Sequence, residues 1–283
     1  MSNASIRASA LSPWMILAPG LLLIFGVMVI PLVDMAVISF REESFGQILP
    51  GFTLKNYIGL LTESANITLF VNTLLSAAAV TVLCALLGFP VAAAIVRAPA
   101  KWRGVLYFLV AAPLLVNTVV RTYGWLLILG GKGLVNEVLL SLGVIDSPLS
   151  MTGNYFGMIV GGTQVFLPFM ILSVTTSLMA IDRRLLEAAE ILGANAFRAF
   201  FTVTLPLATP GLIAGSVLVF SLMLGAFVTP LILGGTAIKY ISVSVYTDAL
   251  VLFNLPRATA LSILLMITVL AVYFVQKKFA KGG

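Results

Sequence analysis

The stretch DRRLLEAAEILGANAFRAFFTVTLP, residues 182–206, separates two long apolar segments in the second half of the chain. Its first half is rich in strong helix formers, and Asp182 stands where it can cap the resulting helix. Arg183 and Glu187 have the i,i+4 spacing that slightly stabilises a helix. Gly193 is expected to end this helix, and a second apolar and aromatic segment then leads to Pro206. The pattern predicts two helical pieces on a loop between membrane-length segments.

Apolar segments of membrane-spanning length lie on both sides of this loop. A spanning helix needs about 20 mostly apolar residues, because the hydrocarbon core is ~30 Å thick. Six segments qualify: Trp14–Phe40, Thr68–Val96, Val105–Leu129, Tyr155–Ile181, Leu207–Leu233 and Thr259–Val275. The first is longer than the apolar part of a signal peptide and no small-residue cleavage site follows it, so we expect a retained helix. The sequence predicts an all-α integral membrane protein with six transmembrane helices in a single domain, residues 1–283.

The composition excludes most other classes of protein. The chain is 60% hydrophobic and 9% charged, which a soluble enzyme, a disordered chain or a secreted disulfide scaffold would not be. It has no histidine, and its single cysteine, Cys84, has no partner for a disulfide or a metal cluster. Residues 130–133 resemble a phosphate-binding loop but lack its upstream Gly and following Ser/Thr. We expect no catalytic residue, no metal site and no cofactor on this chain.

The distribution of Lys and Arg predicts the orientation in the membrane. One side of the six spans carries ten of them: Arg7, Arg97, Lys101, Arg103, Arg183, Arg184, Arg198, Lys277, Lys278 and Lys281. The other side carries five: Arg41, Lys55, Lys132, Lys239 and Arg257. This bias places both termini and the 182–206 loop in the cytoplasm. It also accounts for most of the net charge of +6, so we do not expect nucleic acid to be a partner.

Helix breakers and small residues suggest how the spans pack. Several spans contain proline: Pro31, Pro90, Pro113, Pro168, Pro210 and Pro230. Such prolines are tolerated as kinks in membrane helices, and together they favour a bundle that bends around a cavity. Gly161, Gly162, Gly211 and Gly215 would let neighbouring helices approach closely.

The predicted first helix of the 182–206 loop has an acidic, small-residue surface. Glu187 and Glu190 share a face with Ala188, Ala189 and Gly193. A helix lying on anionic lipid usually carries Lys and Arg on its polar face. The surface is therefore better suited to docking on a protein.

This loop resembles the EAA loop of binding-protein-dependent ABC importer permeases of type I. The resemblance rests on the Glu-Ala-Ala triad, the glycine six residues after the Glu, the two aromatic residues and the Val-x-Leu-Pro ending. It implies that residues 182–206 form a coupling helix that docks on a cytoplasmic ATPase, within a permease core spanning residues 66–275. The implied coupling residues are Glu187, Ala188, Ala189, Glu190, Gly193, Ala194, Phe197 and Pro206.

Further motifs are similar to the first permease subunit of spermidine/putrescine importers. They include Arg121 to Trp125, Gly133 to Asn136, Leu142 to Ile145 and Leu167 to Met170. The similarity extends over roughly residues 10–275. It implies a bacterial inner-membrane complex with a homologous second permease, a dimer of ATPase subunits that hold ATP and magnesium, and a periplasmic substrate-binding protein. The chain itself would not be an enzyme.

Polar residues inside or near the spans are candidates for the translocation pathway or for contact with the binding protein. They are Asp34, Asn72, Asn117, Arg121, Tyr123, Trp125, Gln164, Thr229 and Asp248. Each could instead join helices by hydrogen bonds, and Arg121 and Asp34 could extend to the membrane interface. The residues leave the cargo open: a polyamine follows from the resemblance, while similar permeases carry aminophosphonates, opines, ferric iron or sulfate.

Two other classes of membrane protein remain as alternatives. An ion-coupled secondary transporter would hold ionisable relays deep in its spans, where this chain has almost none. An intramembrane enzyme would need a nucleophile with its base, or a metal site, and the sequence offers neither.

Overall fold

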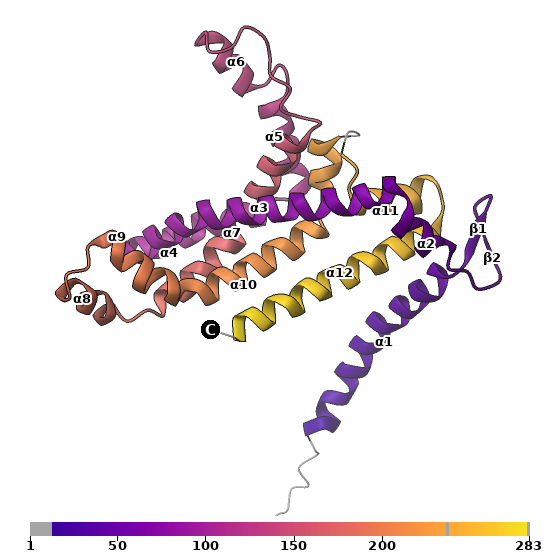
Figure 1. Cartoon of the computed structure of the whole chain (residues 1–283), viewed down its shortest axis with the longest axis horizontal. Helices are drawn as coiled ribbons and strands as arrows, with labels where there is room; N and C mark the ends of the chain where they lie inside the picture. Colours follow the sequence, from indigo (N-terminus) through magenta and orange to yellow (C-terminus); the bar gives the residue numbers. More distant parts are fainter. Residues whose placement is uncertain (1–12, 236–237, 282–283) are drawn as a thin grey trace, which may run out of the picture.

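A computed structural model describes residues 13–235 and 238–281 of the chain. Arg7, which contributes to the predicted orientation, lies outside these residues. Long helices dominate, and one two-stranded antiparallel sheet follows the first of them (Figure 1). The helices and strands are α1 (Pro13–Ser39), β1 (Glu42–Ser44), β2 (Gln47–Leu49), α2 (Lys55–Thr62), α3 (Ser64–Arg97), α4 (Ala100–Ala111), α5 (Thr118–Leu129), α6 (Leu134–Ser141), α7 (Tyr155–Met179), α8 (Arg183–Ile191), α9 (Ala196–Ala199), α10 (Leu205–Leu224), α11 (Ile241–Tyr246) and α12 (Leu255–Lys281).

Five helices are long and apolar enough to cross a membrane, and a bent pair of segments brings the number to six if the pair is counted as one span. The five lie at Leu17–Ser39, Ser64–Arg97, Tyr155–Met179, Ala196–Leu224 and Leu255–Val275. The predicted all-α membrane fold is therefore confirmed, with five to six candidate spans among the described residues. Pro90 and Pro168 lie inside continuous helices, as expected of membrane helices.

The third predicted span, Val105–Leu129, is not one straight helix. Segments Ala100–Leu115 and Thr118–Ser141 meet at 93°. Pro113 lacks the N–H that would continue the α-helix, so the chain tightens into a 3₁₀ turn and extends at Val116. Asn117 then starts α5, because its side chain accepts a hydrogen bond from the Val119 N–H over 2.8 Å.

The fifth predicted span, Leu207–Leu233, is also shorter than expected. Helix α10 ends at Leu224, before Gly225, and the chain continues from Pro230 as a short π-helical segment to Gly234. Glycine disfavours a helix, and proline removes a donor from it, so the apolar run alone overestimates this helix.

The core lies where α3, α7 and α10 pack against one another. Small residues permit this packing, as the sequence predicts. A Cβ on Gly211 of α10 would come within 2.7 Å of the Ser173 carbonyl oxygen of α7. A Cβ on Gly215 would lie 2.7 Å from the sulfur of Met170, and one on Gly162 would lie 3.2 Å from Val80. Interhelical contact at these positions therefore requires glycine.

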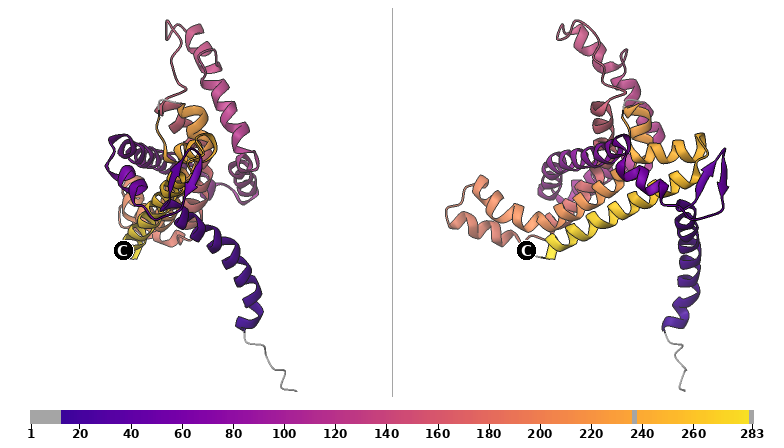
Figure 2. Two further views of the ribbon diagram at one scale, coloured as in Figure 1. Left: turned by 90° about the vertical axis from the view of Figure 1, so that its right-hand side faces the viewer. Right: turned by 45° about the vertical axis from the view of Figure 1, so that its right-hand side comes forward.

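The remaining parts extend from this three-helix core. The segment α8–α9 forms one end of the molecule and the β1–β2 hairpin lies at the opposite end (Figures 1 and 2). Helix α1 leans away from the bundle, and the α5–α6 arm projects to one side of it (Figure 1). Helices α1 and α12 make contact near the hairpin.

Candidate functional site

Helix α8 has a capping motif at each of its ends. The Asp182 carboxylate accepts a hydrogen bond from the Arg184 N–H over 3.0 Å, which confirms Asp182 as the cap. Gly193 ends the helix with φ +84°. Its N–H donates to the Glu190 carbonyl over 2.9 Å, and the Ala194 N–H donates to the Ala189 carbonyl over 3.0 Å. These two bonds form a Schellman motif, whose left-handed residue is usually glycine.

The rest of the loop connects α8 to the core. Asn195 caps α9 by accepting a hydrogen bond from the Arg198 N–H over 2.8 Å. The ring of Phe200 meets the ring of Phe89 on α3 edge to face, with their centroids 5.4 Å apart. Pro206 lies in the first turn of α10, where its missing N–H costs no hydrogen bond. The ring contact thus joins the loop to α3, and the helical segment Ala196–Leu224 joins it to α10.

The coupling residues predicted from the sequence are largely exposed. Glu187, Ala188, Glu190, Gly193 and Phe197 are open to solvent, and Ala189 and Ala194 are half-buried. Two apolar neighbours that the sequence reading did not single out, Ile191 and Leu192, are each 86% exposed. Exposed apolar side chains beside two carboxylates are a typical surface for binding another protein.

A pocket of about 470 Å³ lies behind α8. Glu187 and Glu190 line it from α8, and Arg97 and Arg103 line it from α3 and α4. Arg103 also caps the end of α3, because it donates to the carbonyls of Val96 and Ala98 over 2.9 and 3.0 Å. From the sequence these arginines indicate only the orientation, since no local pattern relates them to a loop so far along the chain.

Two of the candidate pathway residues, one on α5 and one on α7, contact each other, and a third packs against α7 nearby. Trp125 donates its indole N–H to the Gln164 side-chain oxygen over 3.3 Å. Thr229 is buried against Gly161, one turn before Gln164 on α7. An aromatic ring and a polar amide thus meet between α5 and α7, and Thr229 packs against α7 one turn away.

The other candidate pathway residues do not join this cluster. Asn72 donates to the Lys239 carbonyl over 3.3 Å, and Asn117 caps α5. Asp34 and Tyr123 are exposed. Arg121 is half-buried, and its Nε and Nη1 have no hydrogen-bond partner among the described residues.

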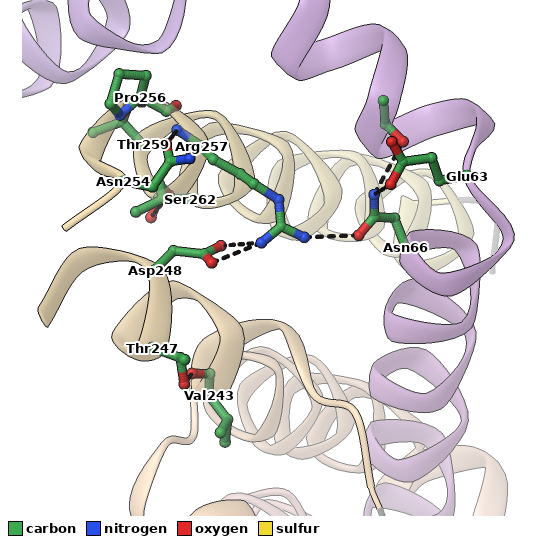
Figure 3. Close-up of polar contacts among 12 residues, drawn as sticks. Glu63, Asn66, Val243, Thr247, Asp248, Asn254, Pro256, Arg257, Thr259 and Ser262 are labelled. Atoms are coloured by element: carbon green, nitrogen blue, oxygen red, sulfur yellow. Dashed lines mark hydrogen bonds and ion pairs between the residues drawn. The ribbon is translucent and has the colours of Figure 1, made fainter. Parts of the chain in front are cut away.

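Asp248 lies in a buried ionic network at the hairpin end of the molecule (Figure 3). Arg257, in the first turn of α12, donates from Nη1 to both Asp248 oxygens at 2.6 Å. Its Nη2 donates to the Asn66 side chain over 2.9 Å, and Asn66 donates to Glu63 over 3.0 Å. Burial raises the pKa of the Asp248 carboxyl above its ordinary value, while the Arg257 charge acts to lower it. Nothing in the sequence relates Arg257, which counts only toward the orientation, to Asn66, because the two residues lie 191 positions apart.

Known proteins are similar to this chain in sequence and in fold. Residues 85–282 match the family described as "Binding-protein-dependent transport system inner membrane component". The spermidine/putrescine transport system permease protein PotB of Haemophilus influenzae is 34% identical over 259 residues, covering 92% of this chain and 90% of the relative.

Two solved structures have the same architecture at lower identity. A bacterial ABC transporter involved in alginate import superposes with a TM-score of 0.74 at 18% identity, covering 95% of this chain and 94% of that one. The alginate transporter in complex with a pentasaccharide-bound periplasmic protein gives 0.73 at 20% identity, covering 93% and 91%. The chain therefore belongs to the family of binding-protein-dependent transport system inner membrane components, the permeases of ABC importers.

Proposed function

We propose that this permease forms half of the translocation pathway of an ATP-driven importer for polyamines. The observation that carries the proposal is the surface of α8–α9. It presents Glu187, Glu190, Ile191, Leu192 and Phe197 to solvent at one end of the molecule. The polyamine assignment is supported by the spermidine/putrescine permease, which matches almost the whole chain.

In this proposal, α8 docks on a dimer of ATPase subunits in the cytoplasm. The Lys and Arg bias on the α8 side of the membrane supports that orientation, which also places both termini in the cytoplasm. ATP and magnesium are held by the ATPase subunits, and this chain contributes no cofactor. Movement of the ATPase would pass to α3 through the contact between Phe200 and Phe89. Residues of α3, α7 and α8 also line one pocket, so these helices adjoin one another at the coupling end.

A homologous second permease would complete the pathway. Our candidate lining is the pair Trp125 and Gln164, because an ammonium group favours an aromatic face and polar oxygen atoms, whereas Thr229 is buried within this chain. Asp248 is expected to support the pathway without binding the cargo itself, because Arg257 already balances its charge at the outer end of the spans. A periplasmic binding protein delivers the cargo to that outer end.

The test is ATP hydrolysis by the complex of both permeases and the ATPase, reconstituted in nanodiscs with the binding protein. We expect spermidine or putrescine, with the binding protein, to stimulate hydrolysis. Stimulation instead by an aminophosphonate, an opine, ferric iron or sulfate would replace the cargo and leave the importer assignment intact. Uptake by this chain alone, driven by an ion gradient, would favour a secondary transporter instead.

A further inference from the structure

Two phenylalanines adopt a backbone conformation that bulky residues avoid. Among the described residues, Phe45 and Phe253 are the non-glycine residues with positive φ, at +51° and +55°. A bulky side chain in this region is strained, and such strain persists only where the surrounding structure imposes it. Neither ring is buried in return, because Phe45 is fully exposed and Phe253 is 63% exposed.

Phe45 is at the tip of the β1–β2 hairpin. The hairpin has a two-residue turn, Phe45 and Gly46, and both have positive φ, as in a type I′ turn. Asn, Asp or Gly is the usual first residue of that turn. The Gly46 N–H donates to the Glu43 side chain, which helps to fix the tip.

The base of the hairpin is held in place by contacts with the following segment. Lys55 pairs with Glu42 at 2.7 Å, and the Asn56 side chain donates to the carbonyls of Ser39 and Arg41 over 3.0 and 2.8 Å. An isolated two-stranded hairpin is at best marginally stable in water, so these contacts hold it in position. The exposed ring of Phe45 is thus displayed on a fixed support.

Phe253 is held in a comparable way between Asp248 and α12. The N–H of Leu252 donates to the Thr247 carbonyl over 2.9 Å, and the N–H of Asn254 donates to the Asp248 carbonyl over 2.7 Å. Strand β1 contacts α12, so both phenylalanines lie at the end of the molecule opposite α8 (Figure 1). The neighbours Leu250, Val251 and Leu252 are also exposed.

We propose that Phe45 and Phe253 are docking residues for the periplasmic binding protein, each inserting into an apolar recess on its surface. This inference rests on the proposed function, which makes this end of the molecule the outer one. Rigid exposed aromatic residues are typical binding hot spots.

The hairpin lacks the basic surface that binds anionic lipid. Residues 41–55 carry two glutamates and two basic residues, Arg41 and Lys55, so their charges balance, whereas helices at a lipid interface are rich in Lys and Arg. Both phenylalanines also lie outside the five apolar spans. The matching surface of the binding protein is therefore expected to be an apolar recess that receives the ring.

The test replaces each phenylalanine with asparagine, which adopts positive φ readily. We expect Phe45→Asn and Phe253→Asn to keep or raise the unfolding temperature of the complex. The affinity for the spermidine-loaded binding protein of the same organism should fall on the order of tenfold or more for each variant. Phe45→Tyr keeps a ring and is the matched control, with nearly unchanged affinity.

Two results would overturn the inference. One is unchanged affinity in both asparagine variants, provided that the wild-type complex binds the protein; no binding by the wild type would instead count against the proposed function. The second result would come from a fluorophore attached to the cysteine of Phe45→Cys. Labelling of that cysteine is selective within this chain, because Cys84 is buried. Quenching by lipid-borne quenchers without the binding protein would place residue 45 in the bilayer. Shielding from iodide when the binding protein is added is the result that we expect.

Discussion

Arg257 and Asp248 form a two-pronged ion pair, in which Arg257 Nη1 lies 2.6 Å from each carboxylate oxygen. The Asp248 side chain is 3% exposed and that of Arg257 is 33% exposed, so the pair is largely removed from water. Through Asn66 the same guanidinium reaches the start of α3 (Figure 3). The network therefore joins α3 and α12, two helices far apart in the sequence.

Removing one member of this pair is expected to destabilise the protein. Asp248→Asn leaves the Arg257 charge without its counter-ion; because that side chain is 33% exposed, solvent screening reduces the loss expected for a buried pair to about 1–3 kcal/mol. The measurement is thermal unfolding in detergent. The double variant Asp248→Asn with Arg257→Gln should lose less stability than the sum of the single variants. Strictly additive losses would mean that the pair does not interact.

Close packing of α7 and α10 makes Gly211 intolerant of a side chain. The added methyl of Gly211→Ala would lie 2.6 Å from Ser177 Cβ and 2.7 Å from the Ser173 oxygen. We expect a loss of about 1–3 kcal/mol from overpacking. Gly104→Ala is the matched control, because a Cβ there meets nothing within 4 Å and alanine favours a helix. Equal unfolding temperatures for both variants would contradict the packing.

Gly193 is expected to be required for its backbone conformation rather than for space. A Cβ there meets nothing within 4 Å, but φ is +84°. ATP-driven uptake should therefore fall in the order Gly, Asn, Ala, since asparagine tolerates left-handed backbone and alanine is disfavoured by about 1–2 kcal/mol. Gly193→Asp should also impair association with the ATPase. Asparagine as harmful as alanine would indicate a steric role instead.

Trp125 is expected to contribute its aromatic face to cargo passage. Trp125→Phe removes the hydrogen bond to Gln164 but keeps a ring, whereas Trp125→Leu removes both. The KM for spermidine uptake by proteoliposomes should rise more for leucine than for phenylalanine, because cation–π attraction is about 0.5–2 kcal/mol. Equal effects of the two substitutions would assign Trp125 to helix packing.

The spans and the coupling loop could be predicted because their signals are local. Apolar length locates the helices, and Asp182 and Gly193 mark the ends of α8 as the structure has them. Two predicted spans were too long, because a proline or glycine within the apolar run interrupts the helix. Pro113 divides the third span, and Gly225 ends α10 before the predicted Leu233.

The polar networks could not be predicted, because they depend on pairings between distant segments. Nothing near Asn66 in the sequence indicates that it faces Arg257. The hairpin was also missed, since its strands are three residues each and the first turn position holds Phe45 instead of a turn former. That departure from the local rule is the feature that suggests a function for the hairpin.

The most direct measurement is uptake of labelled spermidine into proteoliposomes that contain ATP and carry the permease pair with its ATPase. In the presence of the binding protein we predict uptake that requires ATP. Leu192→Asp, which places a charge beside Ile191 at the exposed C-terminal end of α8, should abolish it by releasing the ATPase. Full uptake by the Leu192→Asp complex, or by this chain without any ATPase, would contradict the assignment of α8 as the coupling element.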